Sequence, residues 1–179
     1  MLKVSRLDKL HTRISGFTLI EMVVVIAILG IISSVMFANF RFGKKELTLT
    51  NAAENLVGDL RLAQNMSLGL KIEEGVIPQG GYGMRVQVGS STYELFADSG
   101  DKIYQADEMV NTVSLPDEVE ITSISTGTPS DIVFVPPHMD IYINASQSSD
   151  EVIVFLQLKG TSKTKQVFIN RVSGRIEVK

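Results

Sequence analysis

The hydrophobic pattern of the chain changes twice, and its first section is an apolar run. From Met22 to Phe40, 19 consecutive residues carry no charge. As a helix rising about 1.5 Å per residue, this run is about 28 Å long, close to the hydrocarbon thickness of a bilayer. The pattern therefore predicts a membrane-spanning helix over about residues 18–40.

Beyond this run the apolar residues recur at three- and four-residue spacing, as on one face of a helix. The recurring positions are Leu49, Ala53, Leu56, Leu60, Ala63 and Ser67. No proline interrupts Phe17 to Val76, so we expect one helix over 17–71 whose second half packs one face on a core. Gly43, beside a basic cluster, is the predicted position of a bend.

The third section, residues 72–179, has the pattern of a β-domain. "EEGVIPQGGYG" ends the helix with glycines and a proline. Nine short β-rich runs follow: "YGMRVQV", "TYELFAD", "VNTVSL", "EVEITSI", "DIVFV", "MDIYIN", "VIVFLQL", "KQVFIN" and "RIEV". Their alternation and spacing predict an antiparallel sheet that packs on the apolar stripe of the helix, which is an α+β fold.

Charge and cysteine content narrow the possible functions. The 179 residues include no cysteine, which excludes disulfides, thiolate metal sites and a cysteine nucleophile. The first 16 residues carry four basic side chains against Asp8, and this excess favours a cytoplasmic N-terminus. Basic residues also flank the other end of the apolar run, so the charge bias alone is weak evidence.

A single carboxylate, Glu21, lies at the start of the apolar segment. Thr18 and Glu21 have the spacing of a capping box, which is a purely local explanation. A cleaved secretory signal is a second alternative, but the run exceeds the usual 7–15 apolar residues of such signals. Met36 also lies two positions before Ala38, the best small residue for that cleavage. A plain uncleaved anchor is a third alternative.

The stretch "SGFTLIEMVVVIAILGIIS" resembles the N-terminal signature of type IV pilins and type II secretion pseudopilins. In this resemblance Gly16 precedes the cleavage site, Phe17 becomes the new N-terminus, and Glu21 is the glutamate five residues in. The resemblance implies that residues 1–16 are a leader, removed by a membrane prepilin peptidase that also methylates the Phe17 amine. It further implies a filament core formed by apolar residues of the helix: Met22, Val23, Val24, Val25, Ile26, Ile28, Leu29, Ile31 and Ile32.

Cleavage would place a positive amine on Phe17 one helical turn from Glu21. A carboxylate in an apolar environment is unfavourable by a few kcal/mol and normally finds a partner. We therefore hypothesise that Glu21 pairs with the Phe17 amine of a neighbouring subunit and sets the register of assembly.

The rest of the chain resembles H-type minor pseudopilins and related minor pilins, through "NAAENLVGDLRLAQN", "YELFADSGDKIYQADEMVNTVSLPDEVEI" and "QVFINRVSGRIEV". This resemblance implies the pilin fold and favours a minor subunit over a major one. Its implied partners are the prepilin peptidase/methyltransferase, other pilin or pseudopilin subunits in a helical filament, an inner-membrane assembly platform and membrane lipid. The implied location is the bacterial cytoplasmic membrane, crossed once with the β-domain outside, and then a periplasmic or extracellular filament. A DNA-uptake or adhesion pilin and a non-polymerising membrane-anchored binding domain are the alternatives.

Two charged segments were considered as sites. Asp98, Asp101, Asp107 and Glu108 cluster in "ADSGDKIYQADE", and calcium prefers such oxygens. The spacing does not match an EF-hand, so a solvated turn is favoured and no cofactor is expected.

The last 21 residues hold six basic residues against Glu177, but they lack aromatic residues interleaved with the cations, so nucleic acid is not the expected partner. No residues place a nucleophile beside a base, and we expect no enzyme activity.

Overall fold

The computed structural model describes residues 16–73, 75 and 77–179, and it describes no side chains for 37–43. The predicted leader, except Gly16, lies outside this description, and the bend expected at Gly43 stays a prediction. The chain divides into two units, 1–41 and 42–179, which are described separately.

Helix α1, Leu19–Leu68, is one continuous α-helix of 50 residues. Its C-terminal end has the hydrogen bonds of a Schellman motif, in which Leu70 takes a left-handed conformation with φ 46°. The Lys71 N–H donates to the Met66 carbonyl at 3.1 Å, and the Leu70 N–H donates to the Ser67 carbonyl at 3.2 Å. These bonds satisfy carbonyls at the end of α1, which stops at Leu68, three residues before the 71 that the pattern predicted.

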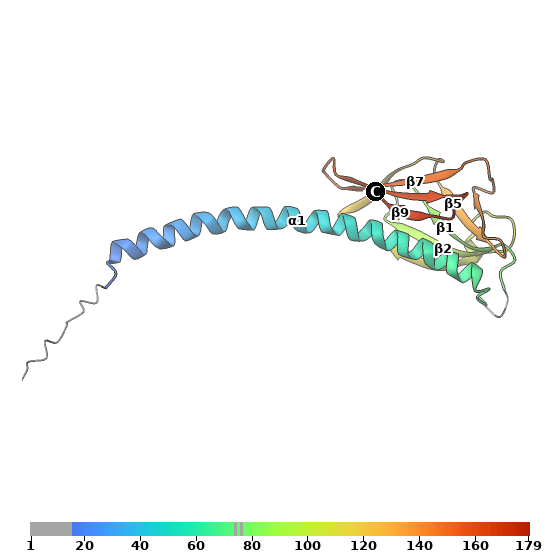
Figure 1. Cartoon of the computed structure of the whole chain (residues 1–179), viewed down its shortest axis with the longest axis horizontal. Coiled ribbons are helices and arrows are strands. Elements are labelled where there is room, and N and C mark those ends of the chain that lie inside the picture. Colours follow the sequence, from blue (N-terminus) through green and yellow to red (C-terminus); the bar gives the residue numbers. More distant parts are fainter. Residues whose placement is uncertain (1–15, 74, 76) are drawn as a thin grey trace, which may run out of the picture. The chain divides into compact units, whose positions relative to one another are not determined.

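Residues 42–179 contain two antiparallel sheets beside the second half of α1 (Figure 1). One sheet has the order β3-β2-β1-β5-β6 and the other β4-β7-β8-β9. Their bounds are β1 Gly81–Val86, β2 Thr92–Asp98, β3 Met109–Ser114, β4 Val119–Ile124, β5 Ser130–Val135, β6 Asp140–Ile143, β7 Glu151–Leu158, β8 Thr164–Asn170 and β9 Ile176–Val178. Each β-rich run of the sequence overlaps one of these strands, and the α+β prediction is confirmed.

The division into two sheets was not predicted. Strands β3 and β4 are adjacent in the chain but pair elsewhere, β3 with β2 and β4 with β7. Pro116 lies between them, and a proline cannot donate a hydrogen bond to a sheet. Alternation within each run predicts which residues face inward, but it carries no information about which strand is the neighbour.

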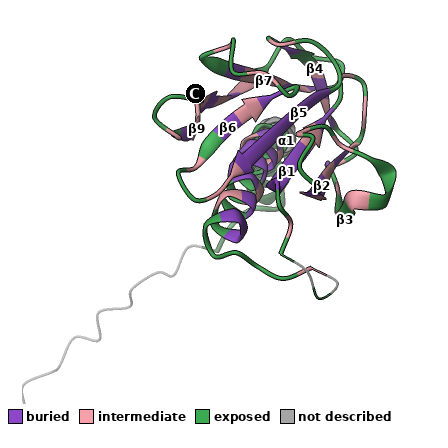
Figure 2. Cartoon of the chain, turned by 90° about the vertical axis from the view of Figure 1, so that its right-hand side faces the viewer, coloured by how far each residue is buried: buried purple, intermediate pink, exposed green. Residues whose placement is uncertain are grey.

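One hydrophobic core lies between α1 and both sheets. The predicted helix stripe is buried at every position, and Leu56 and Leu60 are fully enclosed. Figure 2 shows strands β5 and β1 mostly in purple, as buried residues. The helix and the sheet are also joined by a polar contact, because the buried Tyr82 N–H donates to the Ser67 hydroxyl at 2.7 Å. The neighbouring Gly81 has φ +86°, and a Cβ there would lie 2.1 Å from the Phe134 carbonyl oxygen.

Candidate functional site

The start of α1 is closed by reciprocal hydrogen bonds between Thr18 and Glu21. The Glu21 N–H donates to the Thr18 hydroxyl at 3.2 Å, and the Thr18 N–H donates to Glu21 Oε2 at 3.4 Å. These are the two bonds of a capping box. The local explanation for Glu21 is therefore present in the structure, and the proposed pairing with a Phe17 amine stays a prediction that needs a second subunit.

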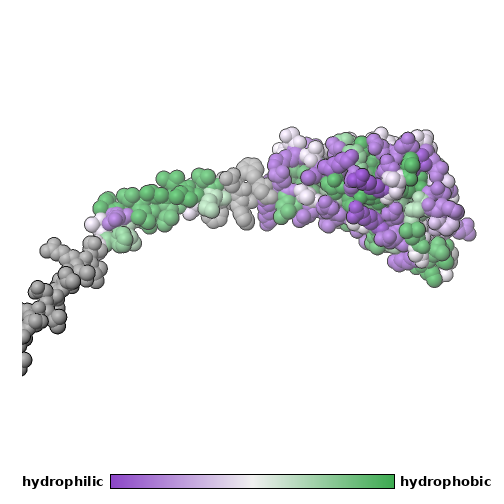
Figure 3. Space-filling model, viewed as in Figure 1, coloured by the Kyte–Doolittle hydropathy of each residue, from purple (hydrophilic) through white to green (hydrophobic). Residues whose placement is uncertain are grey.

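The segment Leu19–Met36 of α1 is long and apolar enough to cross a bilayer, and none of it is buried within the structure. All nine predicted filament-core residues belong to this exposed segment, and Phe17, just before it, is exposed as well. Figure 3 shows hydrophobic side chains covering the visible face of this stretch. An apolar surface of this length is unfavourable in water, so it requires lipid or other helices around it.

The acidic residues of the β2–β3 connection are partly brought together. Asp98, Asp101 and Glu108 each place a carboxylate oxygen within 4.8 Å of the other two. Asp107 does not belong to this group, although it lies beside Glu108 in the short 3-10 helix η1, Ala106–Glu108. Backbone donors orient the group, since Lys102 N–H bonds Asp98 Oδ1 at 2.8 Å and Ser99 N–H bonds Glu108 Oε1 at 2.7 Å.

Residues that the sequence did not single out hold this connection against the five-stranded sheet. The Tyr104 N–H donates to Asp131 Oδ2 at 3.2 Å, and the guanidinium of Arg85 lies 4.8 Å from the centre of the Tyr104 ring. Arg85 Nη1 is also 3.5 Å from Asp131 Oδ1. Asp131 opens the run "DIVFV" after several turn residues, so its position gave no signal of a role beyond punctuation.

Burial raises the pKa of the Asp98 carboxyl to about 6, with the nearby Glu108 and Asp101 carboxylates adding to the rise. The Lys102 N–H opposes this rise. Burial also raises the pKa of Asp131. Asp98 is fully buried, and its Oδ2 atom has no hydrogen-bond partner among the described residues. Asp98 therefore retains a proton more readily than an exposed carboxyl does. The expectation of a solvated turn without a cofactor stays a prediction, with calcium as its less favoured alternative.

We expect the buried Asp98 carboxyl to reduce the stability of the β-domain as pH rises from about 4 to about 7. A carboxyl whose pKa is higher in the folded state than in the unfolded state binds its proton more tightly when folded, so deprotonation favours unfolding. Asp98→Asn keeps the Lys102 hydrogen bond without a titrating charge. We expect it to gain about 3 kcal/mol at pH 7.5, since the rise from 3.8 to about 6 is about two pKa units of about 1.4 kcal/mol each. Urea unfolding of a fragment starting at residue 44, across this pH range, measures the effect.

Asp107→Asn is the matched control because Asp107 is exposed and lies outside the carboxylate group. We expect this variant to keep the wild-type pH dependence. An Asp98→Asn fragment with an undiminished slope between pH 4 and 7 would show that Asp98 titrates normally.

Comparison with known proteins gives information on the N-terminal part of the chain. Residues 11–37 match the family model for the prokaryotic N-terminal methylation motif. The match supports a type IV pilin-like family. Comparisons of the chain with curated proteins and with solved structures find no match.

The methylation motif and the apolar helix that contains its C-terminal part fit anchoring in the inner membrane. The motif also suggests processing by a prepilin peptidase, assembly with other pilins, and a structural subunit rather than an enzyme. It ends at residue 37 and does not extend into the β-domain, so the resemblance to H-type pseudopilins stays a prediction.

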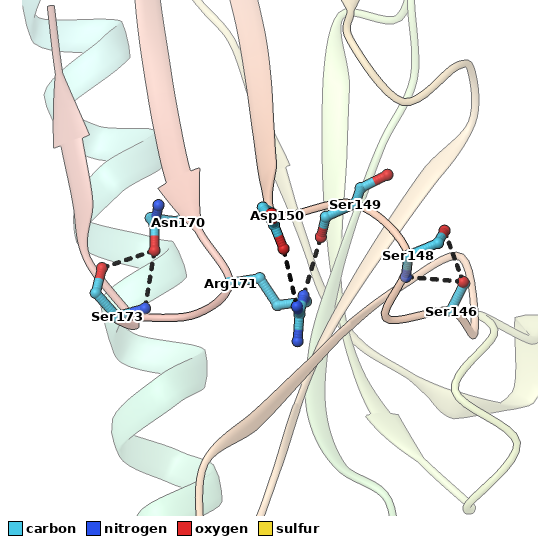
Figure 4. Close-up of polar contacts among 7 residues, drawn as sticks. All are labelled: Ser146, Ser148, Ser149, Asp150, Asn170, Arg171 and Ser173. Atoms are coloured by element: carbon cyan, nitrogen blue, oxygen red, sulfur yellow. Dashed lines mark hydrogen bonds and ion pairs between the residues drawn. The ribbon is translucent and has the colours of Figure 1, made fainter.

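Most of the C-terminal basic side chains have partners within the chain. Lys163 pairs with Glu46 of α1, while Arg175 and Lys179 both pair with Glu177. Arg171 bonds Asp150 Oδ1 and the Ser149 carbonyl, each at 3.0 Å, and so joins the ends of β7 and β8 (Figure 4). These contacts assign structural roles to residues that the sequence presented only as a basic segment.

Proposed function

We propose that this protein is a structural subunit of a type IV pilus or a type II secretion pseudopilus, in a minor rather than a major position. The carrying observation is the methylation motif at 11–37, which includes an apolar segment, Leu19–Met36, that no other part of the described structure covers. The motif supports processing, and the uncovered helix supports burial first in lipid and then among other helices.

The subunit is first held in the cytoplasmic membrane, with its N-terminus in the cytoplasm and its β-domain outside. A prepilin peptidase cleaves after Gly16 and methylates the new Phe17 amine. An assembly platform then moves the subunit out of the bilayer into a helical filament, where apolar residues from Met22 to Phe40 face neighbouring helices. The second half of α1 remains attached to the β-domain through the buried stripe.

Pairing of Glu21 with a neighbouring Phe17 amine sets the position of the subunit in this filament. Low polarity strengthens the attraction between opposite charges, and it makes an unpaired Glu21 costly. The capping-box hydrogen bonds use backbone donors at the helix start. A carboxylate has about four acceptor positions, so Glu21 retains the capacity to accept from an amine as well.

Mass spectrometry of the intact protein from cells with a prepilin peptidase tests this function. We expect the mature chain to begin at Phe17 and to carry one added methyl group. Cells without the peptidase are expected to contain the chain with residues 1–16 attached. Retention of the leader in peptidase-positive cells would support a membrane-anchored binding domain that does not polymerise.

A further inference from the structure

The two sheets have four outer strands, and three of them are protected against pairing with another chain. Strand β9 is three residues long, and side chains of α1 bond the carbonyls around it: Arg61 reaches Ile176 at 2.7 Å and Gln64 reaches Gly174 at 3.3 Å. Strand β6 has four residues and begins with the charged Asp140. Strand β4 carries Glu120 and a register shift between Ile121 and Ser123. Short strands, charges and bulges are the usual means of blocking edge pairing.

The fourth outer strand, β3, lacks these protections over most of its length. Its sequence, MVNTVS, contains neither a charge nor a proline, and four of its six residues are exposed. Figure 2 shows β3 at the margin of the five-stranded sheet, opposite β6. The register shift in its pairing with β2 lies only at its start, beside Met109.

The pairing register shows which backbone groups of β3 face outward. The Leu115 N–H donates to the Ser91 carbonyl at 2.8 Å, on the β2 side. In an antiparallel pair, every second residue hydrogen-bonds to the neighbouring strand through its backbone N–H and C=O. The backbone groups of Val113 and Asn111 therefore face β2, and those of Thr112 face away from it. No strand lies beyond β3 in the described part of the sheet, so these outward groups are available to an added strand.

A pocket of about 430 Å³ opens at the start of β3. Four carboxyl groups line it, from Glu73, Asp98, Asp107 and Glu108, and no basic side chain does so among the described residues. Apolar side chains, including Ile77 of the α1–β1 connection and Val110 of β3, form part of the remaining wall. The Asp98 carboxyl is fully buried, and its Oδ2 atom is without a hydrogen-bond partner in the described structure.

This lining matches the chemistry of a long basic side chain. The aliphatic stem of lysine or arginine covers apolar surface, while its charged end donates hydrogen bonds to carboxylates. Strand addition combines the same two elements, because backbone hydrogen bonds supply affinity and side-chain pockets supply specificity. We propose that β3 and the acidic pocket form one binding site for an extended polypeptide segment, which pairs along β3 and places a lysine or arginine in the pocket.

The site does not depend on leader removal or on filament formation, so it can be tested separately from the proposed function. The probe is a fluorescently labelled peptide of alternating threonine and valine with one central lysine. Two matched peptides carry norleucine or glutamate instead of the lysine. Fluorescence anisotropy with the full-length chain in detergent micelles measures binding of each peptide.

We expect the lysine peptide to bind about tenfold more tightly than the norleucine peptide, and the glutamate peptide to bind most weakly, because the pocket offers only negative partners. Added salt is expected to reduce the difference, since exposed charges are screened. Equal affinities for the three peptides, or no binding of any of them, would overturn the proposal.

Two variants assign binding to the two parts of the site. The double variant Glu73→Gln, Asp107→Asn is expected to remove the preference for lysine while retaining norleucine binding. Thr112→Pro removes an outward N–H and is expected to weaken all three peptides. Asp117→Asn, an exposed carboxylate outside the pocket, is the control and should bind as the wild type does. If Thr112→Pro does not fold, the double variant decides alone, and an unchanged lysine preference in it contradicts the assignment.

Discussion

Glu21→Gln is expected to reduce incorporation of the protein into filaments at least tenfold, while leader removal continues. Glutamine keeps an oxygen that can accept the Thr18 N–H and leaves the Glu21 N–H bond to the Thr18 hydroxyl unchanged. It removes only the negative charge. Truncating one partner of a buried charge pair costs about 2–5 kcal/mol. A tenfold change in an equilibrium constant corresponds to about 1.4 kcal/mol, so the expected loss is at least tenfold. The measurement is the fraction of the protein recovered in sheared filaments, from cells that express the assembly machinery.

Two further variants separate charge from helix capping. Glu21→Ala removes both the charge and the side-chain part of the capping box, so it is expected to assemble no better than Glu21→Gln. Glu54→Gln, an exposed glutamate in the second half of α1, is the control for loss of one charge and should assemble normally. Normal assembly of Glu21→Gln would leave the capping box as the whole explanation of this residue.

Leu56→Ala is expected to destabilise the β-domain by about 3–4 kcal/mol, whereas Leu62→Ala changes its stability by less than about 0.5 kcal/mol. The two leucines lie on the same helix, less than two turns apart. Leu56 is 0% exposed within the core, while Leu62 is 49% exposed. Removing buried methyl groups loses the free energy of their transfer out of water and leaves a cavity in the core. Removing exposed methyl groups loses less transfer free energy and leaves no cavity.

Urea unfolding of the fragment starting at residue 44 measures both free energies. Because the substitution and the helix are the same, differences in helix propensity cancel between the two variants. Similar losses in the two variants would mean that the face of α1 assigned to the core is wrong.

The nine strands were predictable because each depends on a local pattern. Apolar side chains at every second position are recognisable even in a run as short as Val152 to Leu158, and turn residues mark where each run ends. The helix stripe from Leu49 to Ser67 was predictable for the same reason, with a period of 3.6 residues in place of two. The end of α1 was placed three residues too late, because the Schellman motif uses a left-handed Leu70 where glycine is the usual signal.

The acidic pocket was only partly predictable. The sequence brought attention to Asp98, Asp101 and Glu108 because they are close in the chain, and it grouped Asp107 with them. Glu73 lines the pocket, although it precedes Asp98 by more than twenty residues in the chain. Asp131 accepts a hydrogen bond from the Tyr104 N–H, although it follows Tyr104 by 27 residues. Contacts at such separations depend on which strands become neighbours, and no local pattern records that choice.

By itself, the sequence determined the apolar membrane-length segment, the methylation motif, the amphipathic continuation of the helix and the β-rich character of the remainder. These properties follow from composition and periodicity over short windows, where physical preferences are local. Only the tertiary structure decided the division into two sheets, the bare edge of β3 and the pocket beside it. Those features arise from the burial of one shared core, in which each strand's neighbour depends on all the others.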